Sequence, residues 1–177
     1  MHTYNYQLHV TDKETDEHMA ITFVYAFNEV KEREPLWVNL KRIAGSIQGP
    51  WVIGGDFNCV TQAHDRLGGT FSQAEAEPFQ QCLEECEVMD IQSIGAYYTW
   101  NNKQPPATRV YSKLDMLFVN DEWSLKFPDY YANFLPEGHF DHTPCVVGKG
   151  SKGHHKNRPF KYYNIWSAAP GFQECVR

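Results

Sequence analysis

The stretch Trp51-Val52-Ile53-Gly54-Gly55-Asp56-Phe57-Asn58 decides how the rest of the chain can fold. Its apolar start and its two glycines predict a buried strand that ends in a tight turn. Asp56 and Asn58 then lie at the carboxyl end of this strand, where open α/β sheets usually place their chemistry. If the backbone stays extended, side-chain alternation puts both polar side chains on one side of the strand.

Asp56 and Asn58 carry groups that suit the hydrolysis of a phosphate ester. A carboxylate can orient or deprotonate an attacking water, and a carboxamide can donate a hydrogen bond to a phosphate oxygen. The alternative is an Asp-x-Asn turn, whose polar side chains bond only to the local backbone. The stretch alone leaves both interpretations open.

The residues before this stretch predict a βαβ unit. Residues 4–10 and 19–26 are expected to pair as a hairpin. Between residues 30 and 47 the apolar side chains recur at helical spacing, which predicts a helix with Pro35 in its first turn. Strand, helix and strand with short connections are typical of a layered α/β fold.

The second half of the chain contains one further buried strand, Lys113–Val119, with a carboxylate inside it. Burial of Asp115 among apolar residues is costly unless the carboxylate is hydrogen-bonded or paired. A capping-box pattern at residues 72–75 predicts a helix whose regular turns begin only at Pro78. Residues 123–134 are aromatic and are expected to be irregular. Because the chain becomes polar and basic after residue 148, we predict two regions, residues 1–148 and residues 149–177.

The composition is that of one globular domain with a substantial core. The chain has 177 residues, of which 42% are hydrophobic and 15% aromatic. Its net charge of -6 argues against binding of nucleic acid by a broad basic surface, but not against an enzyme with a local charged site. No apolar run is long enough to cross a bilayer, so no membrane association is expected.

The five cysteines are expected to be free thiols. Their number is odd, and the first residues lack the pattern of a secretion signal. Cys82 and Cys86 lie four residues apart on an expected helix, and we interpret them as core-facing thiols rather than zinc ligands. These features predict an intracellular protein, for which the nucleus is one candidate location.

Polar residues at four separated places could form one catalytic group. An aspartate in a strand, such as Asp115, can orient a later histidine, such as His142, and favour its charged form. A charged histidine beside a phosphate stabilises negative charge in the transition state, and a neighbouring carboxylate can contact a divalent cation. Each residue also has a structural alternative, because Tyr25 can simply pack on the core and Asp115 can be a buried hydrogen-bond acceptor. The four places are Tyr25 with Asn28, Asp56 with Asn58, Asp115, and Asp141 with His142.

Five motifs carry a resemblance to a known family. They are Val24–Asn28, Pro50–Asn58, Tyr98–Asn102, Lys113–Asp115 and Asp141–Pro144. In this order they resemble the endonuclease/exonuclease/phosphatase superfamily, which has the DNase I-like fold. The chain is most similar to the endonuclease domain of plant non-LTR retrotransposons. The resemblance implies an α/β fold, a four-layered sandwich of two packed mixed β-sheets flanked by helices.

The resemblance implies phosphate-binding and water-activating roles at the first two places. Tyr25 and Asn28 would hold the scissile phosphate, although Phe27 stands where the family usually has proline. Asp56 would activate the attacking water. Asn58 would position that water or the phosphate.

At the other two places the resemblance implies charge stabilisation and metal binding. Asp115 would pair with His142, and His142 would stabilise the pentavalent phosphorus. Asp141 would help to hold a Mg²⁺ ion. Phe140 stands where the family commonly has serine, which changes the hydrogen bonding of this loop.

The first residues depart from the family pattern. The family's first strand ends in an asparagine, and a glutamate on a later strand is the principal Mg²⁺ ligand, but nothing upstream of Thr22 matches either residue. Glu14 and Glu17 are interpreted as part of a solvated turn. We therefore expect a domain that lacks its opening βα portion, with weakened Mg²⁺ binding.

The resulting functional hypothesis is a Mg²⁺-dependent phosphodiester hydrolase of retrotransposon origin that nicks DNA and whose activity is impaired or lost. A Tyr/Trp-containing tail over residues 157–166 is similar to the segment that precedes reverse transcriptase in such elements. The alternative is a non-catalytic remnant or binding module of the same fold, with exposed apolar surface. A small-molecule phosphatase of the same fold is a third interpretation. Oligomeric state is left open by the sequence.

Overall fold

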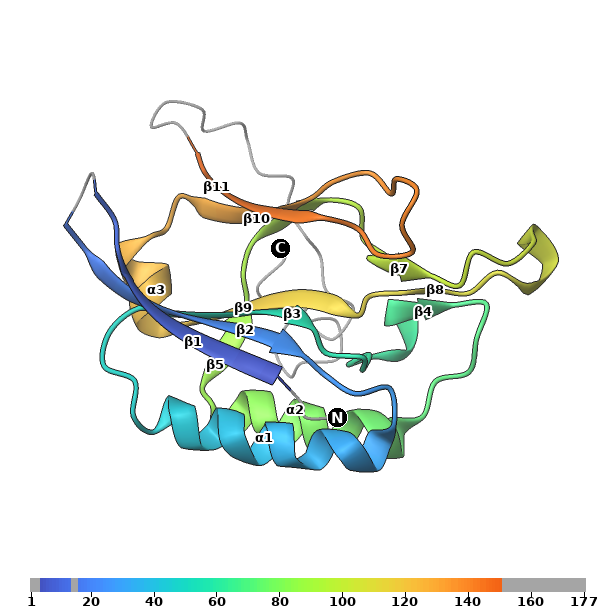
Figure 1. The fold of residues 1–177 in the computed structure, drawn as a ribbon, viewed down its shortest axis with the longest axis horizontal. Helices are drawn as coiled ribbons and strands as arrows, with labels where there is room; N and C mark the ends of the chain where they lie inside the picture. The colour runs from blue at the N-terminus through green and yellow to red at the C-terminus, as the bar shows by residue number, and fades with distance from the viewer. Residues whose placement is uncertain (1–3, 14–15, 151–177) are drawn as a thin grey trace, which may run out of the picture.

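The computed structural model describes residues 4–13 and 16–150, and its elements lie in three layers (Figure 1). The central layer is a five-stranded sheet in the order β1-β2-β3-β9-β5. Its strands are β1 (Tyr4–Thr11), β2 (His18–Tyr25), β3 (Trp51–Asp56), β5 (Val88–Asp90) and β9 (Asp115–Asn120). The sheet is mixed, because β2 and β3 run parallel while the other neighbouring strands are antiparallel.

Two helices cover one face of this sheet. Figure 1 shows α1 (Val30–Ala44) and α2 (Gln73–Glu85) side by side below it. Apolar side chains from both helices fill the space against the sheet, where Phe57 and Phe79 stack at 4.9 Å and are fully buried. Burial of such a continuous apolar face is the main force that holds the two layers together.

A second mixed sheet packs on the opposite face. It consists of β6 (Ser93–Gly95), β10 (Tyr130–Phe134) and β11 (Cys145–Lys149), in the order β11-β10-β6. Met19, Val52 and Val119 of the central sheet meet Ala132 and Phe134 of the second sheet in a shared core. The predicted α/β fold with two packed mixed sheets and flanking helices is therefore confirmed.

Short elements complete the end of the molecule at which β3 terminates. A small antiparallel sheet, in the order β4-β8-β7, contains β4 (Arg66–Leu67), β7 (Trp100–Asn101) and β8 (Tyr111–Ser112). Single 3₁₀ turns occupy Ala63–Asp65 and Pro106–Thr108. Within the described part of the chain, none of the helices is long and apolar enough to span a membrane.

The predicted hairpin and the strand that ends at Asp56 are confirmed, but both prolines lie deeper in their helices than predicted. Pro35 lies in the second turn of α1 and Pro78 inside α2, not at the point where regular helix begins. In each helix a buried side chain precedes the proline, Arg33 in α1 and Ala76 in α2. Each proline costs its helix one backbone hydrogen bond, and both helices continue through it with buried side chains on either side. Ser72 is the N-cap residue of α2, as predicted, but its side chain makes no capping hydrogen bond.

The prediction of an irregular segment over residues 123–134 is wrong. Helix α3 (Asp121–Lys126) is capped by Asn120, whose side chain accepts a hydrogen bond from the amide of Trp123, and β10 follows it. The aromatic rings of Trp123, Phe127 and Tyr130 pack on one another. Packing between these rings, which have no simple period in the sequence, sets the structure here. The predicted region 149–177 falls almost wholly outside the described residues, so the boundary stays a prediction.

Apolar side chains are exposed on one part of the central sheet. Phe23 is 50% and Leu8 48% exposed. Phe23 lies on the same face as Met19 and Ile21, which contact the second sheet. Leu8 pairs with Ile21 across the β1–β2 ladder and therefore shares this face. The second sheet thus leaves part of an apolar face uncovered in the described structure.

Candidate active site

Three of the predicted site residues lie in one row across the ends of adjacent strands. Tyr25 of β2 is in register with Asp56 of β3, and Asp56 is in register with Asp115 of β9. Residues directly opposite in neighbouring strands have their Cβ atoms about 4.5–5.5 Å apart. The sheet register alone therefore brings two carboxylates together that are far apart in the sequence.

The carboxylate of Asp56 is buried and is held by Asn58. The backbone N–H of Asn58 donates to Asp56 Oδ1 at 2.9 Å, and Asn58 Nδ2 donates to Asp56 Oδ2 at 3.0 Å. The prediction of an extended backbone through Asn58 is wrong, because Asn58 lies in the left-handed region with φ 47. Asparagine tolerates this conformation better than most residues. The local side-chain bonds of a turn are therefore present here, and they hold the carboxylate of Asp56 at the end of β3.

Asn58 is in turn fixed by two neighbouring segments. Its Nδ2 donates a second hydrogen bond to the backbone oxygen of Ala26 at 2.8 Å, so both hydrogens of the side-chain amide are used within the protein. Arg33 Nη1 donates to the backbone oxygen of Asn58 at 2.5 Å. Sequence reasoning missed Arg33, although it stands three and four residues before Leu36 and Trp37, on the buried stripe of α1.

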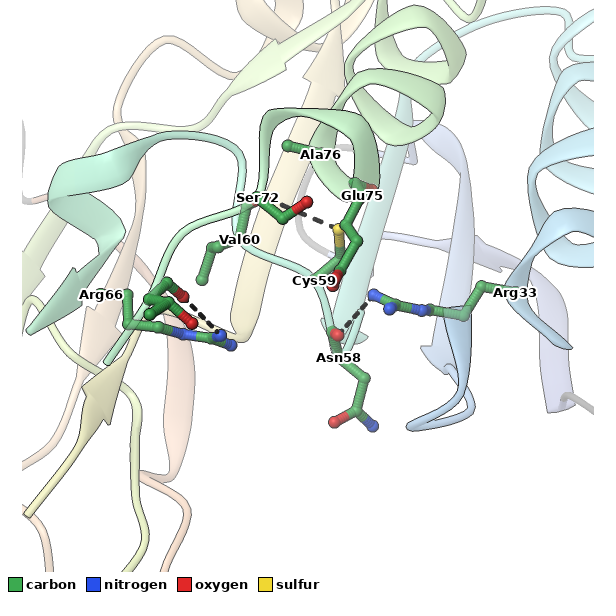
Figure 2. A pocket seen from close by; sticks show the side chains of 9 residues that line it. Arg33, Asn58, Cys59, Val60, Arg66, Ser72, Glu75 and Ala76 are labelled. Atoms are coloured by element: carbon green, nitrogen blue, oxygen red, sulfur yellow. Dashed lines mark hydrogen bonds between the residues drawn. The ribbon is translucent and has the colours of Figure 1, made fainter. Parts of the chain in front are cut away.

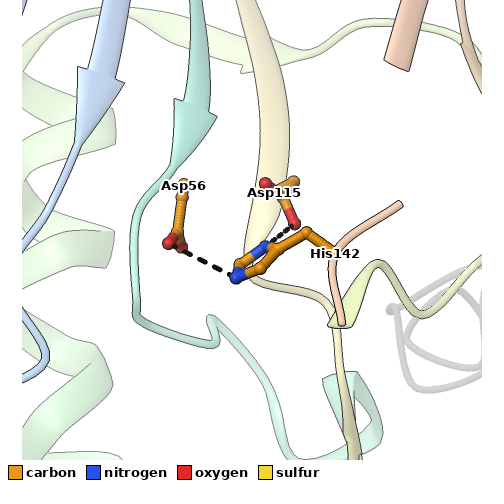
Figure 3. A group of neighbouring side chains, drawn as sticks. All are labelled: Asp56, Asp115 and His142. Carbon is orange, nitrogen blue, oxygen red and sulfur yellow. Dashed lines mark hydrogen bonds and ion pairs between the residues drawn. The ribbon is translucent and has the colours of Figure 1, made fainter. Parts of the chain in front are cut away.

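His142 joins the two carboxylates from a loop between β10 and β11. Its Nδ1 bonds to Asp115 Oδ2 at 2.9 Å, and its Nε2 lies 3.9 Å from Asp56 Oδ2 (Figure 3). The imidazole thus stands between the carboxylate of Asp115, which orients it, and the buried carboxylate of Asp56 at the end of β3. Such an arrangement fixes which ring nitrogen is directed at a ligand.

Thr99 connects the β9 end and the histidine loop, and sequence reasoning assigned it no role. Its fully buried hydroxyl accepts hydrogen bonds from the amides of Leu114, at 3.0 Å, and Asp115, at 2.8 Å. Its backbone oxygen accepts from the amide of Thr143 at 2.7 Å, next to His142. In the sequence, a role for Thr99 was indicated only by its position in the Tyr98–Asn102 motif. A buried threonine in a β-prone segment is common and does not by itself indicate a function.

The charges of this group are strongly coupled. Burial raises the pKa of Asp56 from 3.8 to about 6, and the negative charges of Asp115 and Asp141 add to the increase. The backbone amide of Asn58 and the charge of His142 act in the opposite direction. Burial lowers the pKa of His142, but its hydrogen bond to Asp115 and the nearby carboxylates outweigh burial and raise that pKa above 6.5. The pKa values of Asp56 and His142 are thus both raised, the first chiefly by burial and the second by its carboxylate partners.

The donor set fits a divalent cation. One ligand atom from each of Asp56, Asp115 and His142 lies within 4.8 Å of the others. The negative charge of Asp115 helps to raise the pKa of Asp56, so a positive ion between the two carboxylates would relieve their repulsion, and hard cations prefer such oxygen ligands. Among the described residues, no glutamate belongs to this group.

The remaining predicted site residues lie at its edge. Tyr25 is 63% exposed, so it does not pack on the core as the structural alternative required. Asn28 is exposed between β2 and α1, and Asp141 is exposed next to His142. The side chain of Asp141 accepts a hydrogen bond of 3.4 Å from Trp100 Nε1, and Trp100 also forms a β-bridge with His142. The structure shows no contact that assigns these three residues their predicted roles.

Comparisons with solved structures identify the fold as DNase I-like. The chain is similar to the endonuclease domain of TRAS1, a telomere-specific non-LTR retrotransposon, with a TM-score of 0.59, 17% identity, and 81% of this chain and 63% of that chain covered. It is also similar to the 3′ phosphatase NExo from Neisseria bound to a product DNA hairpin (TM-score 0.58, 18% identity, 74% and 61% covered). An endonuclease/exonuclease/phosphatase from Bacteroides vulgatus matches with a TM-score of 0.57, 16% identity, and 82% and 54% covered.

These likenesses establish the fold and its class of neighbours, which are nucleases and phosphatases. The chain spans between 54% and 63% of the length of these three structures. Comparisons with protein-family models and with curated proteins give no match.

Proposed function

We propose that this protein is a metal-dependent phosphodiester hydrolase of the DNase I-like fold that nicks DNA, of the type found in non-LTR retrotransposons. The observation that carries the proposal is the Asp56–His142–Asp115 group at the strand ends. The likeness to the TRAS1 endonuclease domain and to a Neisseria phosphatase bound to a DNA hairpin supports DNA as the substrate.

Asp56 is the residue that we assign to the attacking water. Its pKa of about 6 lets the carboxylate be ionised at neutral pH and still accept a proton readily. Asn58 keeps the two carboxylate oxygens in place through its backbone and side-chain amides. Because both side-chain hydrogens of Asn58 are already used, we assign Asn58 to positioning Asp56 rather than to binding the phosphate.

His142 is the residue that we assign to the developing negative charge on the phosphate. The bond from Nδ1 to Asp115 leaves Nε2 directed towards Asp56 and the open end of the site. Its raised pKa favours the charged form, which stabilises a phosphorane-like transition state. Tyr25 and Asn28, both exposed at the same end of the sheet, would hold the non-bridging oxygens of the scissile phosphate.

A Mg²⁺ ion is the cofactor that we propose for this site. Asp56 and Asp115, whose carboxylate oxygens lie within 4.8 Å of each other, would hold it, and Asp141, whose negative charge also acts on Asp56, would help. When bound, such an ion neutralises negative charge on the phosphate and lowers the barrier to attack. Because no glutamate joins the group within the described residues, we propose weak Mg²⁺ binding and low turnover.

A non-catalytic binding module is the second candidate function. This function is favoured because polar groups of the site already bond to one another and not to a substrate. Asn58 Nδ2 and His142 Nδ1 both bond to carboxylates of the same site. A protein with this role would keep the fold and bind DNA or a phosphate without cleaving it.

The test is nicking of supercoiled plasmid in the presence of Mg²⁺. We expect slow nicking that EDTA abolishes, that Asp56→Asn and His142→Ala each abolish, and that declines below about pH 6 as Asp56 becomes protonated. His139→Ala, which removes an exposed histidine of the same loop, is the matched control and should nick like the wild type. Nicking that survives in both site variants would refute the assignment, whereas no nicking by a folded wild type would favour the binding module.

A further inference from the structure

A small cavity lies beside the candidate active site, between α1, the start of α2 and β4 (Figure 2). Its volume is about 70 Å³, well below the size of a drug-like pocket but enough for several water-sized atoms. Asn58 contributes to its wall, and Figure 2 shows the backbone oxygen of Asn58 towards Arg33 while its side chain extends away. The cavity is therefore adjacent to the catalytic group without sharing its carboxylates.

Arg33 is the unusual feature of this cavity. The residue is only 3% exposed, and its Nε has no hydrogen-bond partner. Its guanidinium donates to the neutral backbone oxygen of Asn58 and also lies within hydrogen-bonding reach of the Cys59 thiol, but it forms no salt bridge with any carboxylate in the described chain. A buried guanidinium without a counter-charge is costly, so buried arginines are usually paired with an anion.

The neighbouring thiol does not supply the missing negative charge. Cys59 lines the same cavity and is 4% exposed. Burial raises the pKa of the Cys59 thiol despite the opposing effect of Arg33, so the thiol is neutral at physiological pH. Its Sγ donates to the backbone oxygen of Glu75 at 3.5 Å.

A second arginine and a helix start face the same space. Arg66 also lines the cavity. Its Nε donates a hydrogen bond to the hydroxyl of Ser112 at 3.1 Å, and its Nη1 donates to the backbone oxygen of Thr70 at 3.2 Å. Ser72, the N-cap of the 13-residue helix α2, makes no side-chain capping bond, and its backbone oxygen accepts from the amides of Glu75 and Ala76 at 3.2 Å, which leaves the first two amides of the helix, those of Gln73 and Ala74, for another acceptor. Unsatisfied amides and the helix dipole both favour an anion at this end.

We propose that this cavity is a binding site for a phosphate group, held by Arg33, Arg66 and the first turn of α2. Two arginines and one glutamate, Glu75, line it, so its local charge is positive although the protein as a whole carries -6. Arginine and helix-start amides are suited to the tetrahedral oxygens of phosphate. None of its proposed ligands belongs to the Asp56–His142–Asp115 group, although Arg33 also donates to the backbone oxygen of Asn58, so phosphate binding and nicking are measured separately.

The experiment is calorimetric titration of the full chain with inorganic phosphate at constant ionic strength. We expect saturable binding that persists in Asp56→Asn, falls about tenfold or more in Arg66→Gln, and rises about twofold to fivefold in Glu75→Gln. Arg42→Gln is the matched control, because Arg42 lies exposed on α1 and bonds only to Asn39 there, so phosphate affinity should not change.

The source of the phosphate group is separated with oligonucleotides. Single strands with a 5′ phosphate, a 3′ phosphate or neither are compared in wild type and Arg66→Gln. If Arg66→Gln loses affinity for only one of the phosphorylated strands, the bound group is a terminal phosphate monoester. If Arg66→Gln loses affinity equally for all three strands, the bound group is an internal phosphodiester.

Three results would overturn the proposal. They are the absence of saturable phosphate binding by the wild type, binding that Asp56→Asn abolishes, and binding that neither Arg66→Gln nor Glu75→Gln changes. If Arg66→Gln does not fold, the Glu75→Gln result decides alone, because this change removes an exposed negative charge. Plasmid nicking is measured in a separate assay. If the protein does not nick DNA, the phosphate-binding result can therefore still be interpreted.

Discussion

At the scale of single residues, the candidate site keeps a buried carboxylate in an unfavourable environment. Asp56 is 7% exposed and lies next to Asp115 across the sheet, and within residues 4–13 and 16–150 the amides of Asn58 and the more distant His142 offset this. Retention of such a group against the stability of the fold is typical of functional sites. The effect on stability can be measured apart from any activity.

Asp56→Asn should stabilise the protein at neutral pH. The folded-state pKa of about 6 exceeds the ordinary value of 3.8, so the folded protein binds a proton more tightly than the unfolded chain does. This group's contribution to stability is therefore favourable below pH 3.8 and is lost as the pH rises through 6. Without this penalty, we expect about 1 kcal/mol of added stability at pH 7.5, after allowance for the lost attraction to His142 and for the one hydrogen bond from Asn58 that an asparagine cannot accept, and no added stability at pH 4.

Urea denaturation at several pH values checks this prediction. Asp129→Asn is the control, since it removes an exposed carboxylate far from the site. A variant whose stability advantage over the wild type is the same at pH 4 and pH 7.5 would contradict the argument.

Thr99→Val should disturb both stability and the histidine. Valine keeps the shape of threonine but leaves the buried amides of Leu114 and Asp115 without their acceptor, which we expect to cost about 2–4 kcal/mol. Asp115 would also be less well fixed, so the pKa of His142 should fall in the variant, because the bond to Asp115 is a main cause of its increase.

Thermal unfolding and NMR titration of the His142 ring measure the two effects. Thr99→Ser retains the hydroxyl and should leave the pKa of His142 unchanged, with only a small loss of stability. Equal behaviour of the valine and serine variants would show that the hydroxyl does not position Asp115.

At the scale of elements, the approach of β2 to β3 determines the site. The two strands run parallel and in register up to Tyr25 and Asp56, and Gly55 has a φ of +142 beside the backbone of Val24. A Cβ at Gly55 would lie 2.0 Å from the backbone oxygen of Val24. Only glycine therefore allows the strand to reach Asp56 in this register.

Gly55→Ala should thus separate the strand ends and destabilise the protein. Backbone atoms cannot move aside as a flexible side chain can, so we expect a loss of at least about 2 kcal/mol and loss of any nicking. Gly45→Ala is the matched control, because Gly45 has an ordinary φ of -63 and its nearest atoms are 3.7 Å away. That variant should be neutral or slightly stabilised, and an equally stable Gly55→Ala protein would refute the close approach.

At the scale of the whole molecule, the exposed apolar part of the central sheet is the main unexplained surface. Leu8, Phe23 and Tyr25 lie on β1 and β2, and β1 forms the edge of the sheet. Contiguous apolar surface at a sheet edge favours association. The sandwich is thus closed over β3, β9 and the part of the hairpin around Met19, but open over the part that carries Leu8 and Phe23.

Phe23→Thr combined with Leu8→Thr should reduce association of the protein. Threonine suits a strand and is polar enough for an exposed face, so stability should change by less than about 1 kcal/mol. Sedimentation velocity over a range of concentrations and binding of a hydrophobic dye are the measurements. Leu125→Thr, which removes an 81% exposed side chain on α3, is the control. A wild type that is monomeric and does not bind the dye would contradict the prediction.

The sequence by itself determined the elements with a clear local period and the positions at which their chemistry begins. The hairpin, helix α1, strand β3 and the polar residues Asp56 and Asn58 follow from apolar spacing and from two glycines. These are local properties, because the period of side chains along one segment does not depend on distant residues.

Only the tertiary structure decided how the separated residues meet. Asp115 and His142 are 27 residues apart and join through a loop that Thr99 holds, while Arg33 reaches Asn58 across 25 residues. Helix α3 and strand β10 also form because aromatic rings pack between layers, not because of a local pattern. Long-range hydrogen bonds and packing depend on sheet register and chain crossing, which no short stretch of sequence encodes.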